Sequence, residues 1–163
     1  MAQLFLLNDK AEAALAAIVT PAADGAQVVT GKTATDKQAP PLIICSAAVE
    51  EQEDPPHTGN FFVNCSVAIK TGAVVNEDGT AAADAVADDL EAAVKAQNQA
   101  RVVAIYGVVM VADLAEKMSE AIDDFTVFPA SVVFGASESG RDAKGVWIDV
   151  LHFRCCACGS KLS

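Results

Sequence analysis

The sequence is short of basic residues and of the side chains that most often carry catalysis. Its 163 residues include only two histidines, and 11 lysines and arginines stand against 22 aspartates and glutamates, which gives a formal net charge of −11. Proteins that hold a nucleic-acid backbone do so mainly by neutralising phosphates with lysine and arginine. The charge balance therefore argues against a protein that grips DNA or RNA.

Long hydrophobic runs are also missing. The longest apolar stretch, Val102–Ala112, is well short of the roughly 20 residues that a helix needs to cross a bilayer. The N-terminal segment has no basic region and reaches Asp9 early, so we expect no secretory signal. Five cysteines, an odd number, in a chain without an export signal are typical of free thiols in a reducing compartment.

The common catalytic and nucleotide-binding motifs are absent as well. The chain contains no phosphate loop and no dinucleotide-binding fingerprint. The segment "GASESG" lacks the Gly-x-Ser-x-Gly elbow of serine hydrolases, and we predict a polar turn at Ser137–Gly140. The single tryptophan, Trp147, is more typical of a core or interface anchor than of a substrate platform.

Two clusters invite a metal or acid–base interpretation. The first is "EEQEDPP", Glu50–Pro56, followed by His57. Carboxylates beside a histidine can bind a cation or transfer protons. However, the Asp-Pro-Pro segment keeps the chain extended, and the other histidine, His152, is distant in sequence. We interpret the stretch as an exposed hairpin tip and predict no catalytic residue.

The second cluster is "CCAC" near the C-terminus. Alternation along a strand would place Cys155 on one face and Cys156 with Cys158 on the other. Zinc sites usually use Cys-x-x-Cys pairs in tight turns, and this spacing differs. Small buried residues in a strand are the favoured interpretation, so we predict no metal and no cofactor. A composite site with more distant residues stays an alternative, with Cys45, Cys65 or His152 as its further members.

Apolar residues make up 52 % of the chain, and their spacing predicts helices in three places. The first helix covers residues 3–19 and ends before Pro21. A second follows a turn at Asn76–Thr80 and continues through Val102–Met110, with a core-facing stripe of Val86, Leu90, Ala93, Val94 and Gln97. A third, short helix opens with a capping box at Asp113.

Strands are predicted between these helices and after them. A short strand at 26–31 precedes Leu42–Glu50, which should form an antiparallel hairpin with the alternating run Phe61–Lys70. Two further strands are expected at Phe125–Gly135 and Gly145–Cys158, joined by a polar link. The sequence therefore predicts one domain, residues 1–163, of the α+β class, in which a mostly antiparallel sheet of about four to five strands packs against helices.

The order of these segments resembles the tail terminator, or tail completion, proteins of long-tailed bacteriophages. A proline-led strand, "PPLIICSAAVEE", leads through the acidic turn to "TGNFFVNCSVAIKT", then to a polar loop and a helix. Near the end come "DDFTVFPASVVFG" and "GVWIDVLHFRCCAC". The resemblance covers roughly Pro40–Cys158, and its most telling parts are Glu50–Glu51, Thr58–Asn60 with the strand after it, and Asp124–Phe128.

This resemblance implies a virion structural protein with no enzymatic activity. Such subunits form a hexameric ring on the head-proximal end of the tail tube, stop tube growth and join the tail to neck or connector proteins. Genomic DNA passes through the lumen without specific binding, which an acidic lining would favour. The implied location is the tail–neck junction, after assembly in the bacterial host cytoplasm and without membrane contact.

Two other functions stay open. One is another neck, connector or tail-tube subunit with a similar sheet, and the other is a cytosolic metal- or thiol-dependent protein that uses the C-terminal cysteines. Under the leading interpretation, the acidic hairpin tip and the loop at 71–80 project from the sheet toward neighbouring subunits or the tube. The predicted contact residues are Glu50, Glu51, Glu53, Asp54, Asn76, Glu77 and Asp78.

Overall fold

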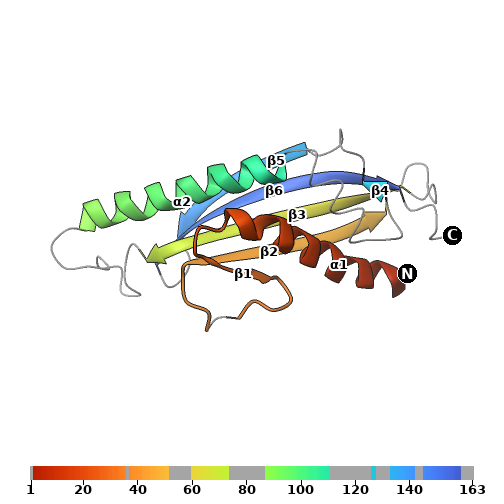
Figure 1. Ribbon diagram of the computed structural model, residues 1–163, viewed down its shortest axis with the longest axis horizontal. Helices are drawn as coiled ribbons and strands as arrows, with labels where there is room; N and C mark the ends of the chain where they lie inside the picture. Colours follow the sequence, from red (N-terminus) through yellow and green to blue (C-terminus); the bar gives the residue numbers. More distant parts are fainter. Residues whose placement is uncertain are drawn as a thin grey trace.

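The computed structural model has two long helices packed against one sheet (Figure 1). It describes residues 2–35, 37–51, 60–73, 87–110, 126–127, 133–141 and 145–158. In chain order the elements are α1 (Ala2–Val19), the 3-10 turn η1 (Thr20–Ala22), β1 (Gln27–Thr30), β2 (Leu42–Glu51), β3 (Asn60–Ala73), α2 (Ala87–Val109), β4 (Thr126–Val127), β5 (Val133–Arg141) and β6 (Val146–Cys158). The predicted α+β class is confirmed.

The six described strands form a mixed, mostly antiparallel sheet in the order β1-β2-β3-β6-β4, with β5 also paired to β6. Only the β1–β2 pair is parallel among these strands. The predicted β2–β3 hairpin is confirmed and keeps one register from Leu42 opposite Lys70 to Glu51 opposite Phe61. The strand number exceeds the predicted four to five because the segment predicted as one strand, Phe125–Gly135, contributes to two, β4 and β5.

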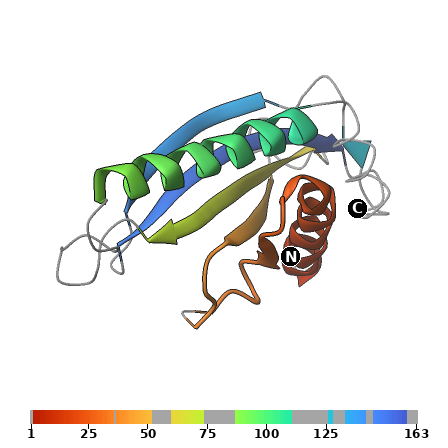
Figure 2. The ribbon, with the colours of Figure 1, turned by 60° about the vertical axis from the view of Figure 1, so that its left-hand side comes forward.

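Both helices cover the same face of the sheet (Figures 1 and 2). Helix α1 packs mainly on β2, and α2 packs on β3 and β6. Burying apolar side chains between the two layers is the main stabilising contribution, at roughly 25 cal/mol for each Å² removed from water. Among the residues that the structure describes, the largest fully buried side chains are Leu15, Ile18, Val19, Ile43, Val63, Val67, Ile69, Ile105 and Leu151.

The side of α2 that faces the core differs from the predicted stripe. The helix does continue through Val102–Val109, and Val94 is buried as predicted. Ala93 and Gln97 are exposed instead, which contradicts the prediction. The buried positions after Val94 are Asn98, Arg101, Ile105 and Val109. The stripe was placed wrongly because Asn98 and Arg101 are buried by hydrogen bonds to residues distant in sequence, which helical periodicity does not reveal. Val86 and the side chain of Leu90 lie outside the described part of the chain.

The predicted turn at Ser137–Gly140 is also wrong. These residues belong to β5 and pair with Leu151–Ile148 of β6. Small polar residues indicated a loop, but they are tolerated in a strand whose side chains are largely exposed. The helix predicted from Asp113 lies outside the described residues. Neither described helix combines the length and apolar character needed to cross a membrane.

Candidate functional site

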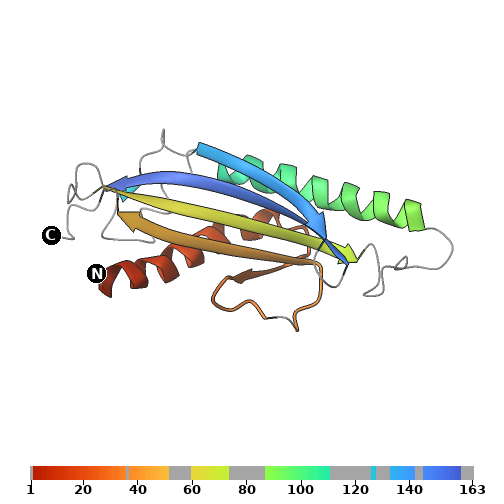
Figure 3. The same cartoon turned by 180° about the vertical axis from the view of Figure 1, so that it is seen from behind.

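The sheet face opposite the helices is the candidate interaction surface (Figure 3). Directly paired residues share a face of a sheet, so side chains of β2, β3, β6 and β5 form rows across it. We call one part of this open face the polar end, formed by Ser46, Glu50, Asn64, Ser66, His152 and Arg154. The other part, which we call the apolar end, is formed mainly by Ile44, Ala68, Ile148 and Val150. It also contains Lys70, directly opposite Ile148, and is bordered by Glu138 of β5, opposite Val150. The combination of an apolar area with a polar border is typical of protein–protein interfaces.

Glu50, the predicted contact residue that the structure describes best, is held by a small network at the polar end. The Asn64 amide Nδ2 donates a hydrogen bond of 3.1 Å to Glu50 Oε2. The Arg154 Nε donates one of 2.9 Å to Asn64 Oδ1, and its Nη2 lies 3.9 Å from Glu50 Oε2. The Arg154 guanidinium also stacks over the Phe62 ring, 4.2 Å from its centroid. The Glu50 carboxylate is therefore locally compensated by the Arg154 guanidinium.

The other predicted contact residues are described only in part. Glu51 ends β2 opposite Phe61, and nothing further is described of its side chain. The remaining ones lie outside the described residues, as does His57: they are Glu53, Asp54, Asn76, Glu77 and Asp78. Whether these residues meet in one surface therefore stays a prediction.

A pocket of about 580 Å³ lies beside the Glu50 network. It is bordered by Phe62, Asn64, Cys65, Val133, Gly135, His152, Phe153 and Arg154. The register of β5 against β6 shifts between Phe134 and Ala136, so Gly135 sits in an irregularity where a Cβ would lie 3.5 Å from the His152 carbonyl oxygen. His152 Nε2 lies 3.5 Å from Glu138 Oε2 across the same two strands. Gly135, at the strand irregularity, and His152 both border the pocket.

The described cysteine thiols are buried in the core rather than gathered in a reactive site. Burial raises the pKa of Cys45 to about 12. A hydrogen bond to Cys155, together with burial, raises the pKa of the Cys65 thiol well above its ordinary range. Cys155 faces the core, whereas His152 belongs to the opposite face of β6, so the composite site with His152 is not brought together by these residues. The side chains of Cys156 and Cys158 are outside the described part.

Metal ligation was the other chemistry considered for these residues. Across the described ranges, no group of three or more histidine, cysteine, aspartate or glutamate side chains is placed to hold a metal ion.

A buried polar network between α2 and the sheet was not predicted from the sequence. Asn98 is fully buried and donates to the Ile69 carbonyl at 3.0 Å and to Asp149 Oδ2 at 2.6 Å. It accepts from Thr71 Oγ1 at 2.6 Å, and the same hydroxyl accepts from Arg101 Nη1 at 2.6 Å. Asp149 also accepts from Trp147 Nε1 at 3.1 Å and from the Ser139 hydroxyl. With these bonds Asn98 uses both of its amide hydrogens and its oxygen, so its burial is compensated.

Arg101 extends this network to Ala23 and Asp24, which follow the 3-10 turn η1. Its Nε donates to the Ala23 carbonyl at 3.2 Å and its Nη2 to the Asp24 carbonyl at 3.1 Å. Carbonyl groups at the end of a helical segment lack partners within the helix, and a guanidinium satisfies them well. Helix α2 is thus fixed by hydrogen bonds to β3, to β6 and to the segment that directly follows η1. The role of this network is structural, because it sets the position of α2 over the sheet.

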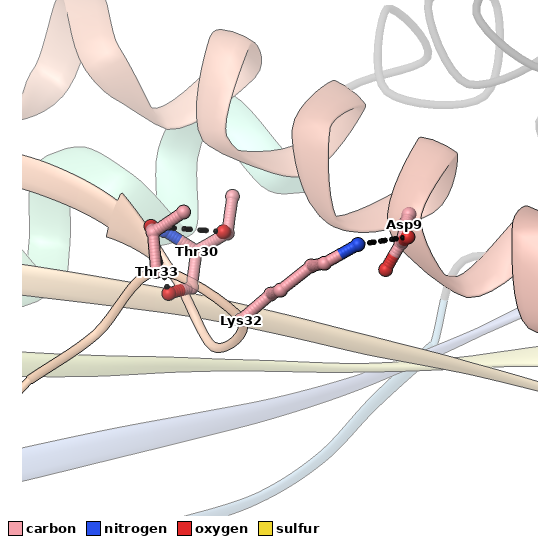
Figure 4. A network of polar contacts seen from close by, with 4 residues as sticks. All are labelled: Asp9, Thr30, Lys32 and Thr33. Atoms are coloured by element: carbon pink, nitrogen blue, oxygen red, sulfur yellow. Dashed lines mark hydrogen bonds and ion pairs between the residues drawn. The ribbon is translucent and has the colours of Figure 1, made fainter.

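The loop after β1 is attached to α1 by a separate polar contact (Figure 4). Lys32 Nζ donates to Asp9 Oδ2 at 2.6 Å, and Thr33 turns back to bond the hydroxyl of Thr30 at 3.0 Å. Nearby, burial raises the pKa of the Glu12 carboxyl, which has one buried oxygen without a hydrogen-bond partner among the described residues. These contacts lie on the helix side, away from the open face.

No protein-family model matches the chain, and no curated protein matches its sequence.

Proposed function

We propose that this protein is a ring-forming structural subunit of the tail terminator type, at the head-proximal end of a bacteriophage tail tube. The proposal is carried by the ordered likeness from Pro40 to Cys158, which spans β2, β3, α2 and β6. In this role the subunit ends tube growth and joins the tail to neck or connector proteins. It acts by binding and geometry, without catalysis.

The charge of the chain supports this role. A formal net charge of −11 disfavours tight contact with nucleic acid. A ring through which DNA passes gains from a lumen that repels the phosphate backbone, since adhesion would slow transfer. An acidic subunit meets this requirement, whereas a DNA-holding connector would need the opposite charge.

The open face of the sheet offers a surface for the contacts that such a ring needs. Its strands are long, with β3 covering Asn60–Ala73 and β6 covering Val146–Cys158, and the described helices leave this side uncovered (Figure 3). At the polar end, Glu50 and Arg154 are already ordered by Asn64. Side chains that are ordered before binding lose less conformational entropy in a complex, which favours their use in a specific contact.

The test is direct observation of assembly. Purified protein should form rings by negative-stain electron microscopy, with a matching mass by light scattering, or should form them when mixed with the cognate tail tubes. Tubes treated with the protein should stop elongating when more tube subunits are added. A monomer that neither binds tubes nor stops their growth would contradict the proposal. Rings that bind elsewhere in the virion would favour another neck or connector subunit.

A further inference from the structure

Helix α2 has a long exposed face without charge. From Ala92 to Met110 the helix contains only two charged residues, Lys95 and Arg101. Arg101 is buried under the helix, and Lys95 Nζ lies 4.3 Å from the centre of the Trp147 ring. We call the exposed side the neutral face of α2; it is formed by Ala92, Ala96, Ala100, Val103, Ala104 and Tyr106. Val103 is 62 % exposed and Tyr106 41 % exposed, which is high for apolar and aromatic residues.

The absence of charge on this face stands out against the rest of the described surface. The outer side of α1 carries Asp9 and Lys10, and the open face of the sheet carries Glu50 and Arg154. In a chain of net charge −11, two copies repel each other wherever acidic surfaces meet. A surface without charge is where a second copy can approach at the least electrostatic cost, whereas a basic partner would be drawn to the acidic surfaces instead.

The shape of the neutral face fits close packing. Its four alanines recur at every fourth residue, so they line one ridge of the helix along about 20 Å at 1.5 Å per residue. Tyr106 lies beside this ridge, and two aromatic rings of the same subunit hold it in place. Its ring packs edge-to-face on Phe134, with the ring centroids 5.3 Å apart, and lies tilted against Phe153, with the centroids 6.4 Å apart. A tyrosine held in one position contributes contact area at low entropic cost, as interface tyrosines commonly do.

The complementary surface is on the other side of the same subunit. The apolar end of the open face presents half-buried Ile44, Ala68, Ile148 and Val150, with the half-buried Lys70 in the same row as Ile148. Helix α2 lies on the opposite face of the sheet (Figures 1 and 3). A sheet with an apolar area on its uncovered face is stabilised when a second helical layer covers it. The neutral face of α2 from a neighbouring copy supplies such a layer.

We propose that subunits associate head to tail, with the neutral face of α2 of one copy packed against the apolar end of the open face of the next. Because the two surfaces differ, a subunit that uses one of them still has the other free to bind a further subunit. Repeated contacts close into a ring when the rotation between neighbouring subunits divides evenly into a full turn. This inference rests on the proposed function for the ring and names the faces through which its subunits meet. The polar end around Glu50 is then left for the tube or the neck.

The experiment uses four glutamate substitutions at alanines. Ala100→Glu places a charge on the neutral face of α2, and Ala17→Glu places the same charge on an exposed position of α1 as its control. Ala68→Glu alters the apolar end of the open face, and Ala48→Glu, exposed nearer the polar end, is its control. Circular dichroism and thermal unfolding report whether each variant is folded. Sedimentation velocity should show that the apparent affinity of self-association is at least tenfold weaker in A100E and A68E than in the wild type. The controls A17E and A48E should associate as the wild type does.

Mixing the two disrupted variants tests the head-to-tail geometry. A100E keeps an intact open face and A68E keeps an intact α2, so an equimolar mixture should form a heterodimer that grows no further. Wild-type assembly by A68E alone, or no heterodimer in the mixture, overturns the inference.

The outcomes also separate this inference from the proposed function. Rings that persist in A100E contradict the inference and leave the proposed function standing. Oligomers that are lost in A100E but that never bind tail tubes support the inference and contradict the proposed function. Wild-type protein that stays monomeric both at its highest soluble concentration and in the presence of tail tubes, and that does not stop their growth, contradicts both.

Discussion

Asn98 of α2 and Asp149 of β6 are joined by a hydrogen bond of 2.6 Å between the Asn98 amide and the Asp149 carboxylate. The bond connects a helix to the strand it covers across a distance of 51 residues in sequence. Hydrogen bonds to charged groups are stronger than neutral ones, and a buried amide has no water to replace a lost partner. The pair therefore fixes the height and rotation of α2 over the sheet.

Replacement of Asn98 tests this role. Asn98→Ala removes bonds to Ile69, Thr71 and Asp149 and leaves their polar atoms without this partner. We expect a loss of about 1–3 kcal/mol in the free energy of unfolding, measured by urea denaturation. Gln99→Ala removes an amide from an exposed position of the same helix and should change stability by less than about 0.5 kcal/mol. Equal effects of the two changes would contradict the structural role of Asn98.

A charge reversal at Glu50 separates the effect of charge on assembly at the polar end from its effect on the stability of the fold. Glu50→Lys removes the acceptor of the Asn64 bond and brings a second cation toward Arg154. Since the residues are exposed, the stability change should stay within about 1 kcal/mol, while assembly on tail tubes should weaken, more so when Glu51 is also reversed. Asp9→Lys is the matched control, because it breaks an exposed ion pair with Lys32 on the helix side. Tube binding that is unchanged in E50K would reject a contact at this end.

The cysteine interpretation is tested by thiol labelling. Because burial raises the pKa of Cys45 to about 12, its thiolate is scarce at pH 8, and iodoacetamide should leave Cys45 unmodified in folded protein. Labelling should appear only when urea unfolds the chain, as read by mass spectrometry of digested protein. Rapid modification of Cys45 under native conditions would show that the core is open there and would revive a thiol-dependent function.

Glu12 gives the protein a dependence on pH. Burial raises its pKa from the ordinary value of 4.5, so the folded state binds this proton more tightly than the unfolded state. Stability then falls as pH rises from about 4.5 through the raised pKa, because ionising the carboxyl costs more in the fold. The unfolding free energy of the wild type relative to Glu12→Gln should therefore decrease from pH 4 to pH 7. A difference that is constant or that increases over this range would contradict the assignment.

The parts of the fold that the sequence predicts are those governed by local periodicity. The strand β3 was predicted because Val63, Cys65, Val67 and Ile69 alternate with polar residues, and all four are buried. The hairpin with β2 followed from the two strands being neighbours in sequence. The continuation of α2 through Val102–Val109 was predicted despite β-branched residues, and tertiary packing of Ile105 and Val109 supports it.

The parts that were missed depend on partners far away in sequence. Asn98 and Arg101 are polar, and their burial is stabilised by groups such as Asp149 and the Ala23 carbonyl that no local pattern identifies. The same holds for the candidate surface. Alternation places Asn64 on the open face, but its pairing with Arg154, 90 residues later, depends on the register of β3 against β6.

That register has a consequence for the order in which the subunit matures. The strand β3 pairs with β6 from Asn60 opposite Cys158 to Ala73 opposite Val146, so the centre of the sheet joins two distant parts of the chain. During synthesis on the ribosome, the edge of β3 that pairs with β6 stays unpaired until residues 146–158 have emerged. Incomplete chains lack the β6 part of the surface on which α2 packs and the β6 residues of the open face, so the surfaces of the proposed association are complete only in the finished subunit. The proposed association therefore depends on completion of the sheet.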